Sequence, residues 1–422
     1  MRRSVFLLIV LLGTVPVRGQ EEDEDVSPYK EMKTLARAVE LIRQDYVDED
    51  KTGYEQLIYS ALRGMMEALD PHSDFMDPKD FKEMQEDTRS EFGGLGVVVG
   101  MKKERLTIVA PMEGTPGFRA GLLPGDVLME IDGQSAEKMS LRDAVDKLRG
   151  EPGTSVKLVI GREGEADPLP FEIEREVIKV PSVRGAKVLE GEGPRIGYVR
   201  VTQFSEPTGK EFARALNELE KQRIDGLVID LRFNPGGLLG SAVEVAGEFL
   251  PAGALVAYTE GRSAAAERRY LAPGKGREPR TYPVAVLVNG SSASGAEIVA
   301  GALKDSGRAL LVGETTFGKG SVQSVVSLPD GSAARLTTAK YFTPGQQPIH
   351  EKGVDPHVVA TMSAEEAARL LSLRRQEDLP PGTKREKIKT VEDVPLQRAV
   401  DALRGVLLHA KEGTDRAPSG EG

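Results

Sequence analysis

Residues 284–304 read VAVLVNGSSASGAEIVAGALK, and this stretch decides the fold class. The apolar run Val284–Val288 predicts a buried strand, and Ala296–Lys304 predicts a helix. The small residues between them place Ser294 at or next to the first turn of the helix. Free backbone N–H groups and the positive end of the helix dipole gather there, and they can stabilise an oxyanion formed when a serine attacks a carbonyl. Ser294 also has an ordinary interpretation as a helix N-cap.

A nucleophilic serine needs a base, and the usual base, histidine, is scarce in this chain. The four histidines are His72, His350, His357 and His409. The first and the last are not expected to reach Ser294, whereas spacing alone does not exclude the other two. A lysine can serve instead if burial lowers its pKa from about 10 toward about 7–8. Lys319 is the candidate because it follows the apolar run Ala309–Val312 and is flanked by glycines, although a solvated loop lysine is its ordinary interpretation.

Residues 313–320 nearly match a phosphate-binding loop, but two features exclude that interpretation. Gly320 stands where Ser or Thr should hold the metal, and Ser321–Leu328 predicts a strand where the phosphate loop must open a helix. No cluster of His, Asp or Glu has the spacing of a metal site. We therefore expect neither a metal nor any other cofactor.

Composition limits the class of protein. The chain has 422 residues, 39% of them hydrophobic, and a formal net charge of −10. This length is enough for two or three domains, and mixed charges with a negative balance argue against a nucleic-acid binder. The chain contains no cysteine, which excludes disulfides and thiolate chemistry. A soluble globular protein is therefore expected.

The N-terminal segment predicts export. Arg2 and Arg3 precede the apolar run Val5–Leu12, and small residues continue to Gly19. This layout is typical of a secretory signal peptide over residues 1–20, with an uncleaved anchor as the alternative. The run is shorter than the roughly 18–20 apolar residues of a membrane span, and no other stretch is long and apolar enough. We expect no stable membrane span after signal removal.

Changes in sequence pattern predict five segments. They are a signal peptide over 1–20, an acidic leader with a helical region over 21–90, a β-rich domain over 91–178, a core over 185–375, and a linker with a C-terminal helix over 376–422. In the core, apolar runs such as Leu227–Leu231 alternate with helical stretches such as Thr208–Lys221. Residues 260–282 are predicted to form a surface loop or flap. The fold class is therefore α/β, within a multi-domain α+β chain.

Several motifs together resemble one family. Ser294 through Glu297 is followed, 25 residues after the serine, by Lys319 in the sequence FGKGSVQ. Three other motifs keep the same order, LDPHS at 69–73, DLRFNPGG at 230–237 and GVDP at 353–356. This set resembles the C-terminal processing peptidases, also called tail-specific proteases. The resemblance runs from about residue 30 to about residue 410.

The resemblance implies a role for each matching residue. Ser294 would be the nucleophile and Lys319 its general base, which is the serine–lysine variant of the catalytic triad. Gln323 would orient the lysine amine, although a glutamine on a strand surface is its ordinary interpretation. Asp305 matches a position proposed as a third catalytic group, but we favour its interpretation as a helix-end residue.

The resemblance also implies an oxyanion hole made of backbone N–H groups. The Gly295 N–H would act with one from Gly236 or Gly237, because glycine lets the backbone approach the substrate closely. Three positions, in two places, depart from the family. Gly295 and Ala296 stand where Ala and Ser are common, and His357 stands where an acidic residue is common. Neither departure changes the spacing between the serine and the lysine.

A second resemblance covers the β-rich domain, residues 91–178. EFGGLGV at 91–97, RAGL at 119–122 and PGD at 124–126 resemble a PDZ domain. The implied loop, whose N–H groups would bind the C-terminal carboxylate of a peptide, consists of Gly94, Leu95, Gly96 and Val97. Apolar side chains of the following strand and helix would line a groove or form the domain's own core. They are Leu95, Val97, Val99, Leu141, Val145 and Leu148.

These resemblances imply an exported serine endopeptidase of the bacterial periplasm or cell envelope. It would recognise protein substrates by exposed apolar C-termini and cut them through an acyl-enzyme, and docking at the PDZ domain would gate the site. One alternative is a catalytically inactive PDZ scaffold that binds peptides. Another is a different enzyme on a related core, such as one acting on acyl thioesters. Because the terminal helices are amphipathic, they would join subunits into a homo-oligomer.

Overall fold

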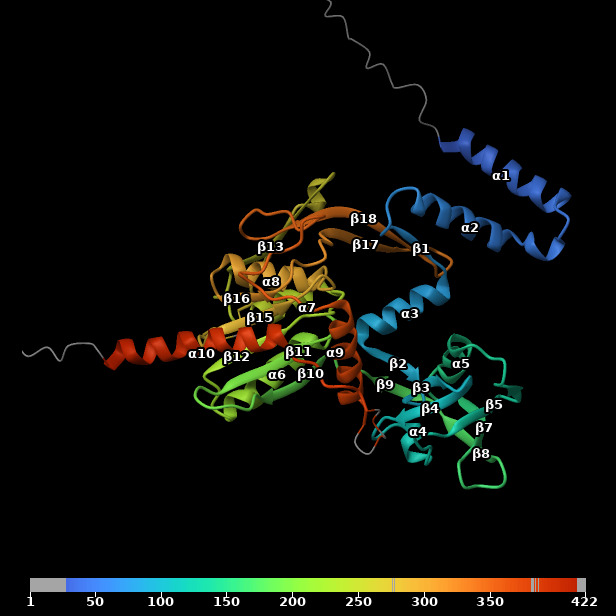
Figure 1. The fold of residues 1–422 in the computed structure, drawn as a ribbon. Helices are drawn as coiled ribbons and strands as arrows, with labels where there is room; N and C mark the ends of the chain where they lie inside the picture. The colour runs from blue at the N-terminus through green and yellow to red at the C-terminus, as the bar shows by residue number, and fades with distance from the viewer. Residues whose placement is uncertain are drawn as a thin grey trace, which may run out of the picture. The chain divides into compact units, whose positions relative to one another are not determined.

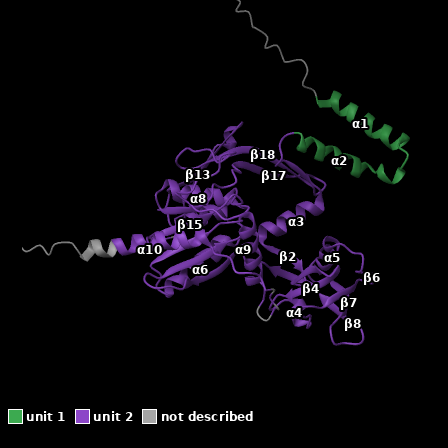
Figure 2. Ribbon diagram, in the orientation of Figure 1, with its two compact units in different colours: residues 1–68 green, residues 69–422 purple. Residues whose placement is uncertain are grey.

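The structure is a computed structural model of the chain. It describes residues 28–415 apart from 275, 277, 381, 382, 384 and 386, with side chains described up to residue 409. The chain divides into two compact units, residues 1–68 and residues 69–422 (Figure 2), and each is described by itself. The predicted signal peptide and the acidic leader lie outside the described residues.

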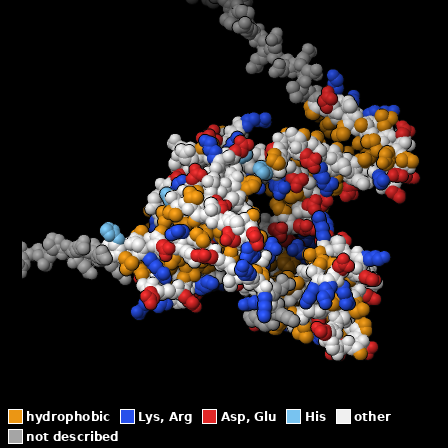
Figure 3. All heavy atoms as spheres, in the orientation of Figure 1, with side chains coloured by type: hydrophobic (Ala, Val, Ile, Leu, Met, Phe, Trp, Pro, Cys, Tyr) orange, Lys and Arg blue, Asp and Glu red, His pale blue; other side chains and the backbone are white. Residues whose placement is uncertain are grey.

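The first unit contains two amphipathic helices. α1 spans Pro28–Asp45 and α2 spans Tyr54–Glu67, as the apolar periodicity predicts. Glu40 accepts a hydrogen bond from the Tyr54 hydroxyl (2.7 Å). In these described helices only Val39 is buried, and hydrophobic side chains gather on the surface of the unit (Figure 3). The exposed ones include Tyr29, Met32, Leu35, Leu41, Ile42, Tyr46, Ile58 and Met65.

The core of the second unit is a six-stranded sheet in the order β10-β11-β12-β15-β16-β19 (Figure 1). Its strands are β10 (Val183–Val188), β11 (Ile196–Val201), β12 (Gly226–Asp230), β15 (Val284–Val288), β16 (Ala309–Gly313) and β19 (Val358–Val359). The strands from β11 to β19 run parallel, and β10 pairs antiparallel at one edge. The apolar runs predicted as buried core strands at 284–288 and 309–312 lie here, which confirms the α/β fold class.

Helices cover both faces of this sheet, because side chains alternate between faces along a buried strand. Ile229 and its equivalents on neighbouring strands pack on one face with three helices. These are α6 (Thr208–Lys221), α7 (Leu239–Ala246) and α8 (Gly295–Asp305). The adjacent residue, Val228, packs on the other face with α10 (Val394–Asp415), which lies across β12, β15 and β16.

A second sheet in the same unit has the order β1-β18-β13-β14, with β17 also paired to β18. Its strands are β1 (Asp74–Met76), β13 (Leu255–Gly261), β14 (Arg268–Leu271), β17 (Ser321–Ser327) and β18 (Ala333–Phe342). Two expectations are wrong here. Residues 74–76 form a strand inside the region predicted to be helical, and residues 260–282 contain part of the β13–β14 hairpin. β1 and β14 are each too short for a periodic pattern to be recognised in the sequence.

The β-rich segment forms a separate sheet joined to the rest of the unit by a two-stranded ribbon. The sheet contains β3 (Val97–Lys102), β4 (Arg105–Pro111), β5 (Val127–Ile131), β7 (Ser155–Gly161) and β8 (Leu169–Glu174). In the ribbon, β2 (Glu91–Gly94) pairs with β9 (Glu176–Lys179), directly after α3 (Pro78–Arg89). α5 (Leu141–Leu148) packs beside β3 and β5.

A helix that the sequence pattern does not predict, α9 (Ala364–Glu377), is held by buried charges. Arg374 of α9 donates to Asp230, and Asp393, just before α10, accepts a hydrogen bond from Arg232 (2.6 Å). Asp230 and Arg232 also pair with each other (2.7 Å). Burial would raise the pKa of Asp230, but the two arginines hold it below its ordinary value.

None of the helices in the described part of the chain is long and apolar enough to cross a membrane.

Candidate active site

Three loops at the carboxyl ends of neighbouring parallel strands carry the predicted site. β12 leads into residues 231–237, β15 into residues 289–294, and β16 into residues 314–320. In open α/β sheets, ligands bind at this edge of the sheet. The fold therefore brings the DLRFNPGG motif, Ser294 and Lys319 to one edge, although they are far apart in sequence.

Ser294 lies at the bend between β15 and α8, where its sequence predicts. Its φ of 52° and ψ of −114° lie outside the regions that a residue with a Cβ prefers. Such a conformation costs on the order of 1–3 kcal/mol and occurs where a serine is held on a sharp strand-to-helix turn. The side chain is partly exposed. Ser294 is thus presented to substrate at the start of a buried helix.

Gly236 packs against the Ser294 loop, and the adjacent Gly237 packs against Phe204 in the loop after β11. A Cβ at Gly236 would lie 2.6 Å from Ser294 Cβ, and one at Gly237 would lie 2.1 Å from a backbone oxygen. Their φ values of 101° and 133° also favour glycine. The Gly236 N–H donates to Asn234 Oδ1 (2.8 Å), whereas the N–H groups of Gly237 and Gly295 donate to no described residue. Gly237 is therefore the better partner for Gly295 in the predicted oxyanion hole.

A buried glutamate, to which the sequence-based expectations assign no role, joins the two loops. Glu297 Oε2 accepts hydrogen bonds from the N–H groups of Ser294 (2.8 Å) and Lys319 (2.9 Å). Its Oε1 accepts from the Gly318 N–H (2.7 Å) and the Thr316 hydroxyl (2.5 Å). Because two bonds meet at Oε2, the backbone nitrogens of Ser294 and Lys319 are at most about 6 Å apart. Burial raises the pKa of Glu297, and the four hydrogen bonds oppose that shift.

Lys319 is held in a tight loop. A Cβ at Gly320 would lie 2.2 Å from the His350 backbone nitrogen, and Gly318 has a φ of 88°. The two glycines are therefore required by close backbone packing on either side of the lysine. Lys319 is half-buried, and burial together with the Arg335 charge lowers the pKa of its amine. It is not a fully solvated loop lysine, and its pKa is shifted in the direction that a general base requires.

The predicted nucleophile and base are not hydrogen bonded to each other in this structure. Among the hydrogen bonds of the described residues, none joins Ser294 Oγ to Lys319 Nζ, although both backbones bind one carboxylate. The Gln323 amide donates to Ser321 Oγ (2.8 Å) and not to another site residue. Catalytic hydrogen bonds are often long before substrate binds. The fold therefore brings the Ser294 and Lys319 loops together, but the hydrogen bond between Ser294 Oγ and Lys319 Nζ is not formed in this structure.

The structure does not bring Asp305 to Ser294. Asp305 is the last residue of α8, so it lies about 15 Å from the start of the helix at a rise of about 1.5 Å per residue. It is exposed, and its carboxylate accepts a hydrogen bond from the Gly345 N–H (2.8 Å). This agrees with a helix-end residue and gives no support to a third catalytic group.

Two histidines lie near the base, His72 and also His350, whose backbone packs against Gly320. His72 interacts electrostatically with Lys319, and burial, together with the charge of Lys319, lowers the pKa of His72. His357 Nδ1 accepts a hydrogen bond from a strand N–H (3.0 Å), and His409 is exposed on α10. No described hydrogen bond links any of the four histidines to Ser294. In the part of the chain that the structure describes, no group of three His, Cys, Asp or Glu side chains could hold a metal.

The predicted carboxylate-binding loop, Gly94–Val97, connects β2 to β3. The carbonyls of Leu95 and Gly96 accept hydrogen bonds from the N–H groups of Gly117 (2.8 Å) and Met112 (2.7 Å). Their own N–H groups donate to no other described residue. These donors are the kind of group that captures a peptide carboxylate.

The six apolar residues predicted for the groove or the core differ in burial, and Val145 is intermediate. Leu95 and Leu148 are buried in the domain's core, and Val97 and Val99 pack partly against it. Leu141 is exposed at the start of α5. The core interpretation is therefore right for the first pair, and the exposed helix position is free for a ligand.

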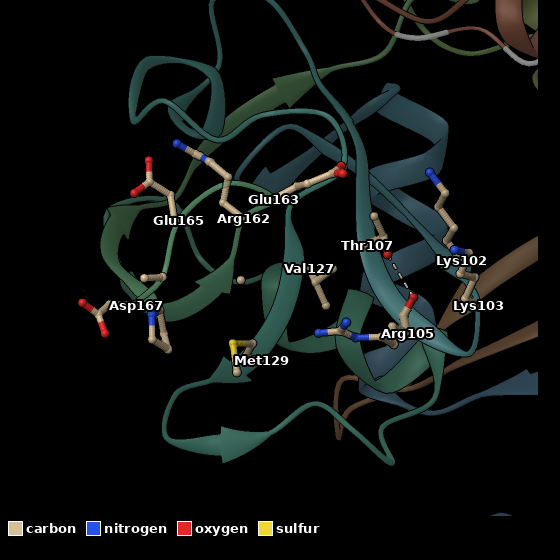
Figure 4. Close-up of a pocket in the computed structure, with 14 residues that line it drawn as sticks. Lys102, Lys103, Arg105, Thr107, Val127, Met129, Arg162, Glu163, Glu165 and Asp167 are labelled. Carbon is tan, nitrogen blue, oxygen red and sulfur yellow. Dashed lines mark hydrogen bonds between the residues drawn. The ribbon is translucent and has the colours of Figure 1, made fainter.

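A separate hollow of about 510 Å³ lies on the β-rich domain (Figure 4). Val127 and Met129 lie between two groups of opposite charge. The basic group is Lys102, Lys103 and Arg105, and the mainly acidic group is Glu163, Glu165 and Asp167, with Arg162 among them. Residues 94–97 do not line it, so it is distinct from the predicted peptide site.

Comparisons with known proteins agree with this arrangement. A model of peptidase family S41 matches residues 195–360, and a PDZ domain model matches residues 107–162. A carboxy-terminal-processing protease of Bartonella bacilliformis is 36% identical, over 96% of this chain and 95% of that protein. A carboxyl-terminal-processing protease of Synechocystis is 39% identical, over 76% of this chain and 74% of that protein. A putative S41 protease from Bacteroides fragilis has a similar fold, with a TM-score of 0.51 and 18% identity over 87% of this chain and 97% of that one. The chain therefore belongs to the carboxy-terminal processing proteases, serine-type peptidases of family S41 that carry a PDZ domain.

Proposed function

We propose that the chain is an endopeptidase in which Ser294 is the nucleophile and Lys319 is its general base. The observation that carries this proposal is the buried Glu297 carboxylate, which accepts a hydrogen bond from the N–H group of each residue. The lowered pKa of Lys319 supports it as well, because only a neutral amine can accept the serine proton. The N–H groups of Gly237 and Gly295 donate to no described residue, so they are available to stabilise the oxyanion that such a reaction forms.

The proposed reaction has two steps. As Ser294 Oγ attacks the substrate carbonyl, the neutral Lys319 amine takes its proton, and the N–H groups of Gly237 and Gly295 stabilise the oxyanion. Lys319 gives this proton to the leaving amine, which frees the C-terminal product and leaves an acyl-enzyme. The same amine then deprotonates a water molecule that hydrolyses the ester and restores the serine. Gln323 orients the amine once its bond to Ser321 is released.

We also propose that the PDZ domain selects protein substrates by their C-termini and gates the site. The N–H groups of Leu95 and Gly96 bind the terminal carboxylate, and the substrate extends along β3 as an added strand. The exposed side chain of Leu141 favours an apolar terminal residue, because it offers an apolar contact beside that strand. A substrate with an amidated C-terminus should then be cut more slowly than the same chain with a free carboxylate.

The test uses an unstructured protein substrate with an apolar C-terminus. Ser294→Ala and Lys319→Ala should each abolish cleavage, while exposed neighbours of the same type, Ser291→Ala and Lys340→Ala, should not. Mass spectrometry of the products distinguishes endoproteolysis from trimming of single residues. Retained cleavage in either Ser294→Ala or Lys319→Ala would show that another group performs the reaction.

Two further proposals concern location and assembly. The N-terminal pattern supports export to the periplasm or cell envelope, and N-terminal sequencing of protein recovered outside the cytoplasm would test it. The exposed apolar side chains of α1 and α2 support self-association through this unit. Light scattering of the purified chain should show an oligomer that Met32→Glu weakens. A monomer at all concentrations would refute this assembly.

A further inference from the structure

The LDPHS motif, residues 69–73, has no part in the proposed reaction, yet it forms a well-defined turn. Asp70 Oδ1 accepts hydrogen bonds from the N–H groups of His72 (2.7 Å) and Ser73 (2.9 Å), and Oδ2 accepts one from the Ser73 hydroxyl (2.8 Å). An aspartate that bonds its own following backbone in this way fixes a tight turn. Partial burial would raise the pKa of Asp70, but the hydrogen bonds lower it to about 2, so the carboxylate is ionised at neutral pH.

This turn is fastened to the sheet that carries the base. Thr337 of β18 donates its hydroxyl to Asp70 (3.2 Å) and its N–H to Ser73 Oγ (3.2 Å). In the pairing of β17 with β18, the residue opposite Thr337 is Gln323. The register shifts between Val322 and Gln323, which is an irregularity of the kind that re-aims side chains next to active sites. One threonine thus links the turn to the strand that follows Lys319.

The same turn contains His72, which interacts electrostatically with the Lys319 amine. The titratable and charged groups that act on His72 are Lys319, Asp70, His350 and Arg335. Arg335 is paired with Asp74 (3.2 Å) on the strand that follows the turn, and the Lys319 amine has no hydrogen-bond partner among the described residues. His72 is partly buried and stays neutral near neutral pH, because burial and the Lys319 charge both oppose its protonation.

We propose that the Asp70–Ser73 turn is a positioning element of the peptidase site. Anchored on Thr337, it fixes the strand that carries Gln323 and holds His72 within electrostatic range of the Lys319 amine. The proton affinity of that amine then depends on the charge at position 72. This proposal deepens the function proposed above and rests on Lys319 being the general base.

The first test varies the charge at position 72 in a Ser294→Ala background, so that no cleavage is needed. Competitive acetylation over a range of pH, read by mass spectrometry of the peptide containing Lys319, gives the pKa of this amine. Relative to the neutral His72→Gln, His72→Glu should raise that pKa and His72→Arg should lower it, each on the order of one pH unit. Equal pKa values, or shifts of the same sign in both variants, overturn the proposal. The assignment of Lys319 as the base is tested by a different measurement: it is wrong if Lys319→Ala, in the chain that keeps Ser294, retains cleavage.

The second test addresses the anchor in the active full-length chain. Thr337→Val removes the hydroxyl bonded to Asp70, whereas Thr337→Ser keeps it. We expect kcat to fall about tenfold in the valine variant with KM nearly unchanged, and to recover in the serine variant. Thr338→Val is the matched control, since its hydroxyl bonds Ser324 on the same strand pair (2.7 Å). A valine variant as active as the parent, or no recovery with serine, contradicts the proposal.

Discussion

Replacing Glu297 by glutamine should damage both stability and catalysis. The carboxylate accepts four hydrogen bonds, two at each oxygen, from buried or partly buried donors. A glutamine side chain keeps the shape but offers one acceptor oxygen, so its NH₂ group faces two donors of the protein. A buried donor without a partner costs about 1–3 kcal/mol, which gives a loss of about 2–6 kcal/mol in the free energy of unfolding.

The catalytic loss should be larger than stability alone explains. If the NH₂ group replaces Oε2, it displaces the N–H groups of Ser294 and Lys319; if it replaces Oε1, it displaces two donors in the loop just before Lys319. A displacement of about 1 Å in reacting groups can cost about 100-fold in rate. Denaturant unfolding and steady-state cleavage of a protein substrate would measure the two effects. Glu366→Gln is a matched control, because Glu366 accepts a hydrogen bond from the Ser363 N–H (2.8 Å) at the start of α9, and this bond is exposed to solvent. A Glu297→Gln protein with the parent's stability and kcat/KM would refute the reasoning.

Three other changes have definite expected outcomes. Gly237→Ala should lower kcat by about 100-fold or more, because the new Cβ meets a backbone oxygen and displaces the backbone N–H that serves as an oxyanion donor. Gly240→Ala on α7, where a Cβ meets nothing, should be active, and equal activity of the two variants would contradict this. Arg335→Met removes a charge that lowers the pKa of Lys319, so the acidic limb of the pH profile of kcat/KM should move to higher pH. An acidic limb that stays at the same pH, or moves to lower pH, would contradict this prediction. Asp70 has a pKa of about 2 in the folded chain against 3.8 ordinarily, so its contribution to stability is present above about pH 4 and lost as the pH falls toward 2. The stability difference between the parent and Asp70→Asn should therefore shrink over that range in urea unfolding at several pH values, and a constant difference would exclude it.

The elements that the sequence predicts well are those with a strong periodic pattern. The buried strand at 284–288 and the helix that follows Ser294 are unambiguous, because an apolar run, small residues and an apolar helix occur in succession. The shift in the pKa of Lys319 could not be derived from sequence, since it arises from burial and from Arg335 on another strand. Glu297 was visible only as the fourth residue of a Ser-x-x-Glu pattern that also starts ordinary helices.

Contacts between distant segments account for the rest. Nothing local in LDPHS indicates that its turn binds a threonine in a strand that lies more than 260 positions later. The β1 strand has three residues and the β14 strand has four, which is too few for alternation to be recognised. Asp305 shows the converse, since a match to a motif position places a residue in sequence but not in space; the favoured interpretation as a helix-end residue agrees with its position at the end of α8.

The charge cluster around Asp230 has a consequence for how the protein folds. Asp230 precedes the glycines of the site by a few residues, but Arg374 lies 144 positions further along the chain, and Asp393 lies 161 positions after Arg232. Asp230 and Arg232 pair with each other, but Arg374 and Asp393 complete the cluster. Because breaking a buried ion pair costs about 3–5 kcal/mol, this edge of the sheet is fully stabilised only when those late segments are in place. An ordered peptidase edge therefore requires the chain beyond residue 374, and a protein truncated before Arg374 should fold with this edge of the sheet incompletely stabilised.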